Sequence, residues 1–429
     1  MQQSQRAADN HALEYAVRRA NELGLPVRVV FGLWKDYPEA NTRHFTFLLE
    51  GLRETQRELR TRGVPLLVSA GHPTAAALAQ AAAAALLVTD CGYLRHQRGW
   101  RSLVAEQAPC RVAAVESDAI VPVETASNKA EYGAYTIRRK LWRQAERFLV
   151  PVAATPLRHP LRQVPERGLD LEQEPELLCR QLGIRAGSAP PVSRFFRGGG
   201  SQALIRFRRF LKDSLARYQA HHNQPQCGDV SCMSPYLHFG QISPLRLALE
   251  LAAIPPSENS EALEEQLLVR RELALNHAFF NRAYDAYEGL PAWAQQTLEK
   301  HALDPRPYRY PLPQLEAAET HDPYWNACMT EMRITGFLHN YLRMYWGKKI
   351  LEWSASPQEG FAAALALNNA YFLDGRDPNS YAGVGWVFGL HDRPWPQRPI
   401  FGKVRSMTAA GLERKCDIRA YLAFVATLL

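Results

Sequence analysis

The sequence contains no hydrophobic run long enough to cross a membrane. Its longest apolar stretch, residues 75–88, consists mostly of alanine and includes a glutamine, whereas a membrane helix needs about 20 apolar residues. The N-terminus, MQQSQRAADNH, also lacks the apolar segment of a secretory signal peptide. These absences predict a protein of the cytoplasm.

Cysteine is scarce and scattered. The seven cysteines include no CxxC pair, and Cys227 and Cys232 have no histidine or cysteine partners at zinc-binding spacing. The motifs GxGxxG, GxxxxGK[ST], GxSxG and HExxH do not occur either. We therefore expect free thiols in a reducing compartment, no metal site and no common phosphate loop or serine-hydrolase elbow.

The 429 residues predict two to three domains, and the apolar content of 46% is typical of a folded globular protein. In residues 1–150, segments with helical periodicity alternate with short β-branched runs. Helices are expected over residues 9–23, 44–62, 74–85 and 94–107, and strands over 27–33, 65–69, 86–90 and 111–115. This alternation predicts a Rossmann-like, doubly wound parallel sheet.

The alternation begins with a helix, whereas a sheet of this kind usually begins with a strand. Either a strand encoded ahead of Met1 is missing, or the first strand comes later in the chain. If a central strand is missing, we expect poor expression of the 429-residue chain, and better solubility when about twenty upstream residues are added.

Residues 151–201 carry seven prolines and a glycine triplet, which predicts an interdomain linker with a short helix over 175–182. Residues 202–429 are expected to form an all-α domain. Its predicted helices cover residues 203–220, 244–252, 263–283, 292–301, 331–353, 357–370 and 417–428.

Positive charge gathers in two windows. Residues 194–212 hold six basic residues and no acidic one, and residues 386–415 hold six basic residues against two acidic ones. Phenylalanine and tryptophan are interleaved with these charges, which is typical of a polyanion-binding surface. Charge alone leaves an ordinary solvated helix face equally open.

Two features of the helical half suggest a binding site. Arg343 lies in an otherwise apolar helical segment and needs a partner or ligand, for which Asp374 in the loop LDGRDPNSY is the natural candidate. Ser231 and Ser234 precede Pro235, an arrangement that binds anions at a helix start or simply caps the helix. Trp346 is two helical turns from Trp353, and a core aromatic stripe is the plain interpretation of that spacing.

The strings MSPYLHFGQISPLRLALE, RRELALNHAF, HDPYWNA, LRMYWGKKILEW and LDGRDPNSYAGVGW occur in this order. Together they resemble class II cyclobutane pyrimidine dimer photolyases over nearly the whole chain. The resemblance implies an N-terminal α/β domain with an antenna chromophore of unspecified identity. It also implies a helical domain that binds FAD and DNA, and a monomer without metal. In that family, photoexcited reduced FAD passes an electron to a pyrimidine dimer flipped out of DNA, and the dimer splits.

The resemblance also assigns residues. The positions matching those that hold FAD are Tyr218, Val230, Ser231, Cys232, Met233, Ser234, Arg271, Asn340, Arg343, Asn368, Asp374, Gly375 and Arg376. Among them, Arg343 and Asp374 match an ion pair beside the flavin ring, and Asn368 matches an asparagine facing its reactive nitrogen. The tryptophans that match an inward electron relay are Trp346, Trp325 and Trp353. The positions matching residues that hold the lesion and its DNA are Gln266, Met344, Trp386, Trp395, Lys403 and Arg405.

The sequence departs from the family pattern at a few positions. Gln266 stands where many members have glutamate, so it can donate a hydrogen bond to a pyrimidine but cannot supply a proton. His222 replaces a common arginine, and Asn340 a common glycine. The family also normally has a strand ahead of the stretch that begins near Met1.

Two other functions are compatible with parts of this sequence. A cryptochrome-like blue-light photoreceptor without repair activity would keep FAD and the tryptophans, but this sequence has no tail after the last expected helix. A flavin-free nucleic-acid-binding module would leave Arg343 and Asp374 without a purpose. The motifs favour a light-driven repair enzyme that acts on DNA containing pyrimidine dimers.

Overall fold

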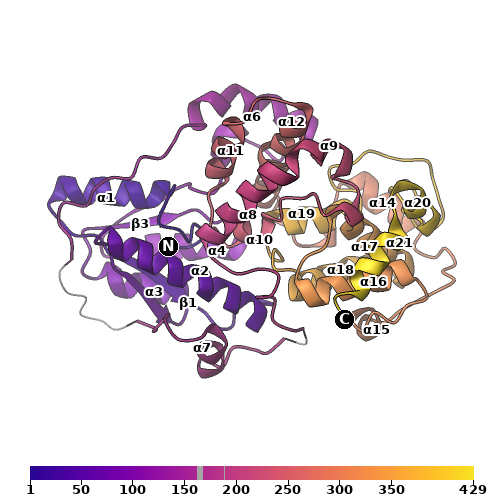
Figure 1. Ribbon diagram of the computed structural model, residues 1–429, viewed down its shortest axis with the longest axis horizontal. Coiled ribbons are helices and arrows are strands. Elements are labelled where there is room, and N and C mark those ends of the chain that lie inside the picture. Colours follow the sequence, from indigo (N-terminus) through magenta and orange to yellow (C-terminus); the bar gives the residue numbers. More distant parts are fainter. Residues whose placement is uncertain (162–167, 188) are drawn as a thin grey trace.

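The computed structural model describes residues 1–161, 168–187 and 189–429, so the part of the predicted linker at 162–167 and 188 lies outside the described residues. The N-terminal elements follow the expected alternation. They are α1 (His11–Leu23), β1 (Val29–Leu33), α2 (Thr42–Thr61), β2 (Leu66–Ala70), α3 (Pro73–Ala81), β3 (Leu86–Asp90), α4 (Arg95–Gln107) and β4 (Arg111–Val115). Figure 1 shows them gathered on one side of the molecule, with helices α14 to α21 on the other.

All four of these strands pair in parallel, but they form two separate sheets. Strand β1 pairs with β2, and β3 pairs with β4. The chain start lies between them: the amino group of Met1 donates to the carbonyl of Val30 at 3.0 Å. The backbone N–H groups of Gln2 and Gln3 donate to the Asp90 carboxylate at 2.5 and 2.6 Å. The parallel α/β arrangement is therefore confirmed, and among the described residues the centre of the sheet lacks a strand.

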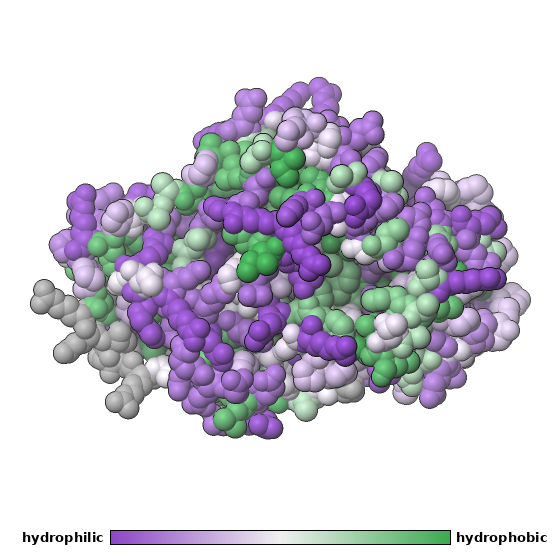
Figure 2. Space-filling view, in the orientation of Figure 1, coloured by the Kyte–Doolittle hydropathy of each residue, from purple (hydrophilic) through white to green (hydrophobic). Residues whose placement is uncertain are grey.

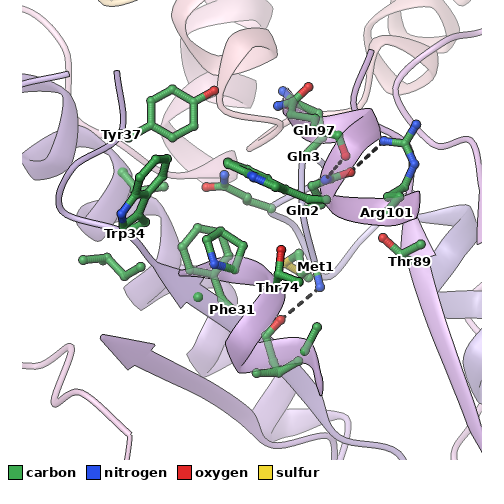
Figure 3. A pocket seen from close by; sticks show the side chains of 18 of the residues that line it. Met1, Gln2, Gln3, Phe31, Trp34, Tyr37, Thr74, Thr89, Gln97 and Arg101 are labelled. Atoms are coloured by element: carbon green, nitrogen blue, oxygen red, sulfur yellow. Dashed lines mark hydrogen bonds between the residues drawn. The ribbon is translucent and has the colours of Figure 1, made fainter. Parts of the chain in front are cut away.

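A cavity of about 170 Å³ lies at this gap. Trp34 and Tyr37 form one wall in Figure 3, and Gln3, Gln97 and Arg101 lie on the opposite side. Side-chain hydrogen bonds connect the second wall, since Gln97 Nε2 donates to Gln3 Oε1 at 2.8 Å. Most of the residues that line the cavity are apolar, including Phe31, Leu33 and Trp34.

The remaining elements are helical, as predicted. Short helices α5 (Val123–Ala126) and α7 (Pro175–Gln181) accompany α6 (Ala134–Phe148) in the first half, and α7 confirms the helix expected near 175–182. The second half comprises α8 (Gly200–Asp213), α9 (Tyr218–His221), α10 (Ser234–His238), α11 (Pro244–Ala252), α12 (Glu258–Glu264), a π-helical turn η3 (Glu265–Arg270), α13 (Arg271–Phe280), α14 (Ala292–Lys300), α15 (Leu312–Glu316), α16 (Pro323–Thr335), α17 (Asn340–Trp353), α18 (Pro357–Tyr371), α19 (Pro378–Val387), α20 (Ala409–Lys415) and α21 (Ile418–Ala426).

The single helix predicted over residues 331–353 is wrong. Helix α16 ends at Thr335, and Gly336 adopts a left-handed conformation with φ of 73°, which closes the helix and turns the chain. His339 then caps α17, because its Nδ1 accepts the backbone N–H of Tyr341 at 3.2 Å. The break gives α16 and α17 different directions and lets their side chains face each other.

The N-terminal and helical halves share one apolar core. A continuous buried cluster includes Val17 of α1, Phe47 of α2, Phe207 of α8 and Leu273 of α13. A second cluster fills the helices from α14 to α21. On the face drawn in Figure 2 most of the surface is hydrophilic, with hydrophobic groups gathered over α11. Among the described residues, no helix combines the length and apolar composition that a membrane span requires.

Candidate active site and nucleic-acid interface

The predicted ion pair between Arg343 and Asp374 is present. Arg343 Nη2 lies 2.9 Å from Asp374 Oδ1 and 3.2 Å from Oδ2. The guanidinium carbon also lies 3.8 Å from the centre of the Phe372 ring, a contact that the sequence did not suggest. The side chains of Arg343 and Asp374 are 15% and 9% exposed. Asp374 thus balances the charge of Arg343 within the otherwise apolar helix α17.

The loop that carries Asp374 joins α18 to α19 and approaches its neighbours closely. A Cβ atom on Gly375 would lie 2.8 Å from the carbonyl oxygen of Asn368, so the backbone path requires glycine here. The loop is fixed at its other end by Leu373, whose N–H donates to the carbonyl of Gly336 at 2.9 Å. The break between α16 and α17 is therefore part of the site.

Asn368 and Arg376 have partners within the protein. Asn368 Nδ2 donates to Asn369 Oδ1 at 3.0 Å and to Ser380 Oγ at 2.6 Å, so both of its N–H groups are used. The backbone N–H of Arg376 donates to Asn369 Oδ1 at 3.0 Å. Its side chain is buried and borders the cavity of the N-terminal half. Asn379, in the first turn of α19, is exposed; its Nδ2 donates to Asp377 Oδ1 at 3.1 Å, which uses one of its two N–H groups.

The segment predicted to bind phosphates leads into a short helix. Ser234 begins α10 and Pro235 follows in its first turn, as predicted. Cys232 has a positive φ of 54°. Among the described residues, no hydrogen bond takes up the backbone N–H groups of Ser231, Cys232 or Met233. These free donors, next to partly exposed hydroxyls, suit an anionic group.

The other predicted cofactor residues lie on the surrounding elements. Tyr218 is buried against Phe210, with 5.7 Å between the ring centres. Arg271 Nη1 donates to the carbonyl of Asp118 at 2.5 Å, so this guanidinium joins α13 to the N-terminal half. Asn340 is exposed at the start of α17, and Val230 is partly exposed.

The three predicted relay tryptophans are buried and connected. The indole N–H of Trp325 donates to the carbonyl of Trp346 at 2.9 Å. The Trp325 and Trp353 rings are 5.5 Å apart. Trp346 meets Phe372 edge-on at 6.0 Å, and Phe372 in turn contacts Arg343. An aromatic path therefore runs from the ion pair toward Trp353, and the indole N–H of Trp346 has no partner among the described residues.

In the predicted DNA-binding loop, residues 386–405, two arginines lie over the ring of one tryptophan. Around Trp395 the guanidinium carbons of Arg405 and Arg393 lie 4.9 and 5.6 Å from the ring centre. The backbone N–H of Trp395 donates to the carbonyl of Lys403 at 2.8 Å, which closes the loop. Lys403 and Arg405 are exposed. Exposed arginines stacked on the partly exposed Trp395 suit a nucleic-acid strand.

Trp386 lies at the other end of this loop and is partly exposed. Arg270, which the sequence motifs did not predict as a site residue, lies with its guanidinium carbon 5.9 Å from the Trp386 ring centre. Gln266 is exposed one turn earlier on η3, and Met344 is half-buried on α17. The arginine could have been suspected from its place next to Arg271 in the string RREL.

The basic window at 194–212 is less free than its sequence suggests. Arg208 pairs with Glu250 of α11 at 2.7 Å, and Arg209 lies 3.7 Å from Asp213. Arg206 Nη2 donates to the carbonyl of Phe195 at 2.6 Å. Carboxylates from outside residues 194–212 therefore balance part of the positive charge of this window.

The donor set fits FAD. Free backbone N–H groups and hydroxyls at 231–234 suit its phosphates, and the exposed amides of Asn340 and Asn379 suit its sugar and ring edges. Arg343, whose positive charge is balanced by Asp374, lies beside the aromatic path. In residues 1–161, 168–187 and 189–429, no three His, Cys, Asp or Glu side chains are grouped to hold a metal ion.

A buried lysine, Lys348, contacts the start of the loop that runs from Trp386 to Arg405. Lys348 of α17 donates from Nζ to the carbonyl of Val387, the last residue of α19. Burial lowers the pKa of Lys348 to about 7, with Asp392 opposing and Arg405 adding to this shift. Unfolding restores the normal, higher pKa, so between pH 7 and pH 10 the unfolded chain binds more protons and stability rises with pH.

We therefore expect Lys348→Met to remove a pH-dependent part of the stability. The thermal midpoint of the wild-type protein should rise relative to that of Lys348→Met as the pH goes from 7 to 9. Midpoints of both proteins by circular dichroism at each pH measure this difference. Parallel curves would mean that the buried ammonium stays charged throughout.

Comparisons with known proteins agree with this geometry. A DNA photolyase family model matches residues 1–160. The chain is 49% identical to a deoxyribodipyrimidine photo-lyase of Methanothermobacter thermautotrophicus, over 98% of this chain and 92% of that protein. It is 38% identical to one of Potorous tridactylus, over 98% of this chain and 79% of that protein.

A solved bacterial class III photolyase from Agrobacterium tumefaciens superposes with a TM-score of 0.74 at 18% identity, covering 99% of this chain and 85% of that one. That likeness concerns the fold alone, whereas the two sequence relatives extend over nearly the whole chain. The chain belongs to the deoxyribodipyrimidine photo-lyase family, as the motif resemblance predicted.

Proposed function

We propose that this protein uses light to split cyclobutane pyrimidine dimers in DNA, with reduced FAD as its electron donor. The observation that carries the proposal is the continuity of the site. The largely buried Arg343–Asp374 pair leads on one side to three connected tryptophans, and on the other Arg343 is followed directly by Met344 on α17. Photoexcited reduced FAD would supply the electron that cleaves the dimer.

The side chains of the protein then have distinct tasks. Ser231, Ser234 and the N–H groups between them would hold the FAD phosphates. The Arg343 guanidinium would favour negative charge on the cofactor, and Asp374 would fix its direction. Both N–H groups of the buried Asn368 are engaged, whereas the exposed Asn379 of α19 uses one of its two in a bond to Asp377, so we assign the contact with the flavin ring to Asn379 and keep Asn368 as its support through Ser380.

Other residues would hold the flipped dimer. Trp386 and Met344 offer a flat and a flexible apolar surface to the two pyrimidines, and Arg270 lies over the Trp386 ring. Gln266 can donate its amide hydrogens to a pyrimidine carbonyl without transferring a proton. Within the chain we assign residues 1–150 to an antenna domain and residues 202–429 to the FAD- and DNA-binding domain.

The test combines a spectrum with a repair assay. Purified protein should show the structured blue absorption of bound flavin. After chemical reduction it should restore dimer-containing oligonucleotides under blue light but not in the dark. Flavin binding with photoreduction but no repair would instead support a photoreceptor. Absence of bound flavin would contradict the assignment of the cofactor.

The exposed loop predicts a salt effect. Arg405→Ala should weaken binding to dimer-containing duplex DNA and should reduce the slope of log K against log salt by about one unit, since each phosphate contact releases about one counterion. Fluorescence anisotropy at several salt concentrations measures the slope. Arg18→Ala on α1, an exposed arginine in the N-terminal half, is the matched control. An unchanged slope in Arg405→Ala would remove this residue from the phosphate contacts.

A further inference from the structure

Helix α6 carries an exposed stripe of aromatic and basic side chains that the proposed function does not use. Tyr135, Arg139, Trp142 and Arg143 are separated by four, three and one residues and therefore share one face of the helix. Tyr135 is 66% exposed and Trp142 is 38% exposed. A contiguous exposed patch of large side chains marks an interaction surface, whereas single exposed ones need no explanation.

The charge of α6 is strongly positive and only partly balanced. The helix AYTIRRKLWRQAERF contains five basic residues and one acidic residue. Arg138 pairs with Glu265 at 2.7 Å, and Lys140 pairs with Glu131. Neither Arg139 nor Arg143 forms an ion pair with any of the described residues, and both are exposed. Their charges are free to meet an anionic partner.

The stripe adjoins the loop that we assign to DNA. Just before α6, the Tyr132 hydroxyl donates to the carbonyl of Asp392 at 3.1 Å, and His391 Nδ1 lies 2.9 Å from the carbonyl of Tyr132. Tyr132 is 45% exposed and meets Tyr135 edge-on at 6.2 Å. The α6 surface therefore continues directly from the segment that leads to Trp395.

A second connection runs to Trp386. Glu265, which pairs with Arg138 of α6, also accepts from Arg270 Nε at 3.2 Å. Arg270 in turn lies over the Trp386 ring, with 5.9 Å between its guanidinium carbon and the ring centre. The ion pairs Arg138–Glu265 and Glu265–Arg270 thus connect α6 to the proposed lesion pocket. In Figure 1 it lies next to α12, which leads into η3.

We propose that the face of α6 formed by Tyr135, Arg139, Trp142 and Arg143 binds the DNA arm that flanks the lesion. Arg139 and Arg143 contact backbone phosphates, and Tyr135 and Trp142 pack against sugars or unpaired bases. The combination of free arginines with exposed aromatic rings suits a nucleic-acid backbone. The inference rests on the proposed function, because it extends the surface of the same site into the N-terminal half of the chain.

The test uses the FAD-loaded full chain and a duplex oligonucleotide with one central pyrimidine dimer. Binding is measured by anisotropy over a salt series for wild type, Arg139→Ala/Arg143→Ala, Tyr135→Ala/Trp142→Ala and the control Arg18→Ala. The double arginine variant should reduce the slope of log K against log salt by about two units. The aromatic variant should bind about tenfold more weakly with an unchanged slope. Arg18→Ala should match wild type.

Two further comparisons separate the possible failures. For undamaged duplex, the double arginine variant should show the same decrease in the slope of log K against log salt, because phosphate contacts do not depend on the lesion. If Arg405→Ala alters the slope while the α6 variants do not, the proposal for α6 is overturned and the proposed function stands. If none of the variants, Arg405→Ala included, changes DNA binding, the proposal for α6 is overturned and Arg405 is removed from the phosphate contacts, whereas the proposed function fails only if the FAD-loaded wild type does not repair the dimer under light. The replaced residues are exposed, so equal melting temperatures show that the variants are folded.

Discussion

Replacing Trp346 with phenylalanine is expected to abolish the photoreduction of oxidised FAD and to leave repair by chemically reduced enzyme intact. Trp346 is only 1% exposed and connects the aromatic path between Phe372 and Trp325. Phenylalanine keeps most of the packing volume but is much harder to oxidise than an indole. Because the repair electron comes from the flavin itself, only the restoration of the reduced cofactor should depend on this residue.

The measurement follows the loss of the oxidised flavin band during blue illumination with an external reductant. Repair is then assayed after chemical reduction. Trp100→Phe is the matched control, because Trp100 packs against Trp34 in the N-terminal half, with 5.9 Å between the rings, away from the relay. If chemically reduced Trp346→Phe also failed to repair DNA, Trp346 would be a structural core residue, as the plain interpretation of the stripe holds.

Much of the fold could be predicted from local pattern. The strand Leu86–Asp90 and the helix Pro244–Ala252 have the predicted bounds, because turn signals and periodicity change at the same residues. Periodicity does not encode which strands become neighbours, so the separation of β1 from β3 could not be foreseen in detail. The break at Gly336 had a signal, a glycine at the end of an apolar helical segment, but the flanking residues continue the helical pattern.

The candidate site was predictable where the sequence placed a charged residue in apolar surroundings, because such a charge requires a partner. A charge in the apolar segment around Arg343 required a partner, and the loop with Asp374 offered one. Contacts between distant segments were not predictable: Glu250 neutralises Arg208 from another helix, and Arg270 lies over Trp386 across a long loop. The internal partners of Asn368 likewise depend on how α18 packs against α19.

Replacing Arg43 with methionine is expected to destabilise the whole protein strongly. Arg43 lies in the first turn of α2 and is only 2% exposed, yet no carboxylate pairs with it among the described residues. Its guanidinium donates instead to backbone carbonyls: Tyr371 at 2.7 Å, Pro190 at 2.8 Å, Met332 at 3.3 Å, and Arg333. One side chain therefore ties the N-terminal half to the linker and to two helices of the second half.

The position of these carbonyls explains why a cation is needed. Tyr371 is the last residue of α18, and Met332 and Arg333 are in the last turn of α16, where the supply of helical N–H donors ends; the Met332 carbonyl accepts the N–H of the capping Gly336 as well. A positive charge at two helix C-termini is favourable. Burial lowers the pKa of Arg43 to about 10, so the side chain still carries its charge at pH 7.

Methionine fills a similar volume but removes the guanidinium donor from these carbonyls. The Met332 carbonyl keeps the N–H of Gly336 at 2.9 Å, and each hydrogen bond lost from a buried carbonyl costs about 1–3 kcal/mol. The sum is comparable to the total stability of about 5–15 kcal/mol of an ordinary domain. We expect a large fall in the urea midpoint measured by circular dichroism, or loss of soluble protein, with a partial recovery in Arg43→Lys. Arg57→Met, on the same helix, removes an exposed arginine that pairs with Glu172 and should change the midpoint little. Equal midpoints for Arg43→Met and wild type would show that water or another donor replaces the guanidinium, and that the two halves are held together by their shared apolar core alone.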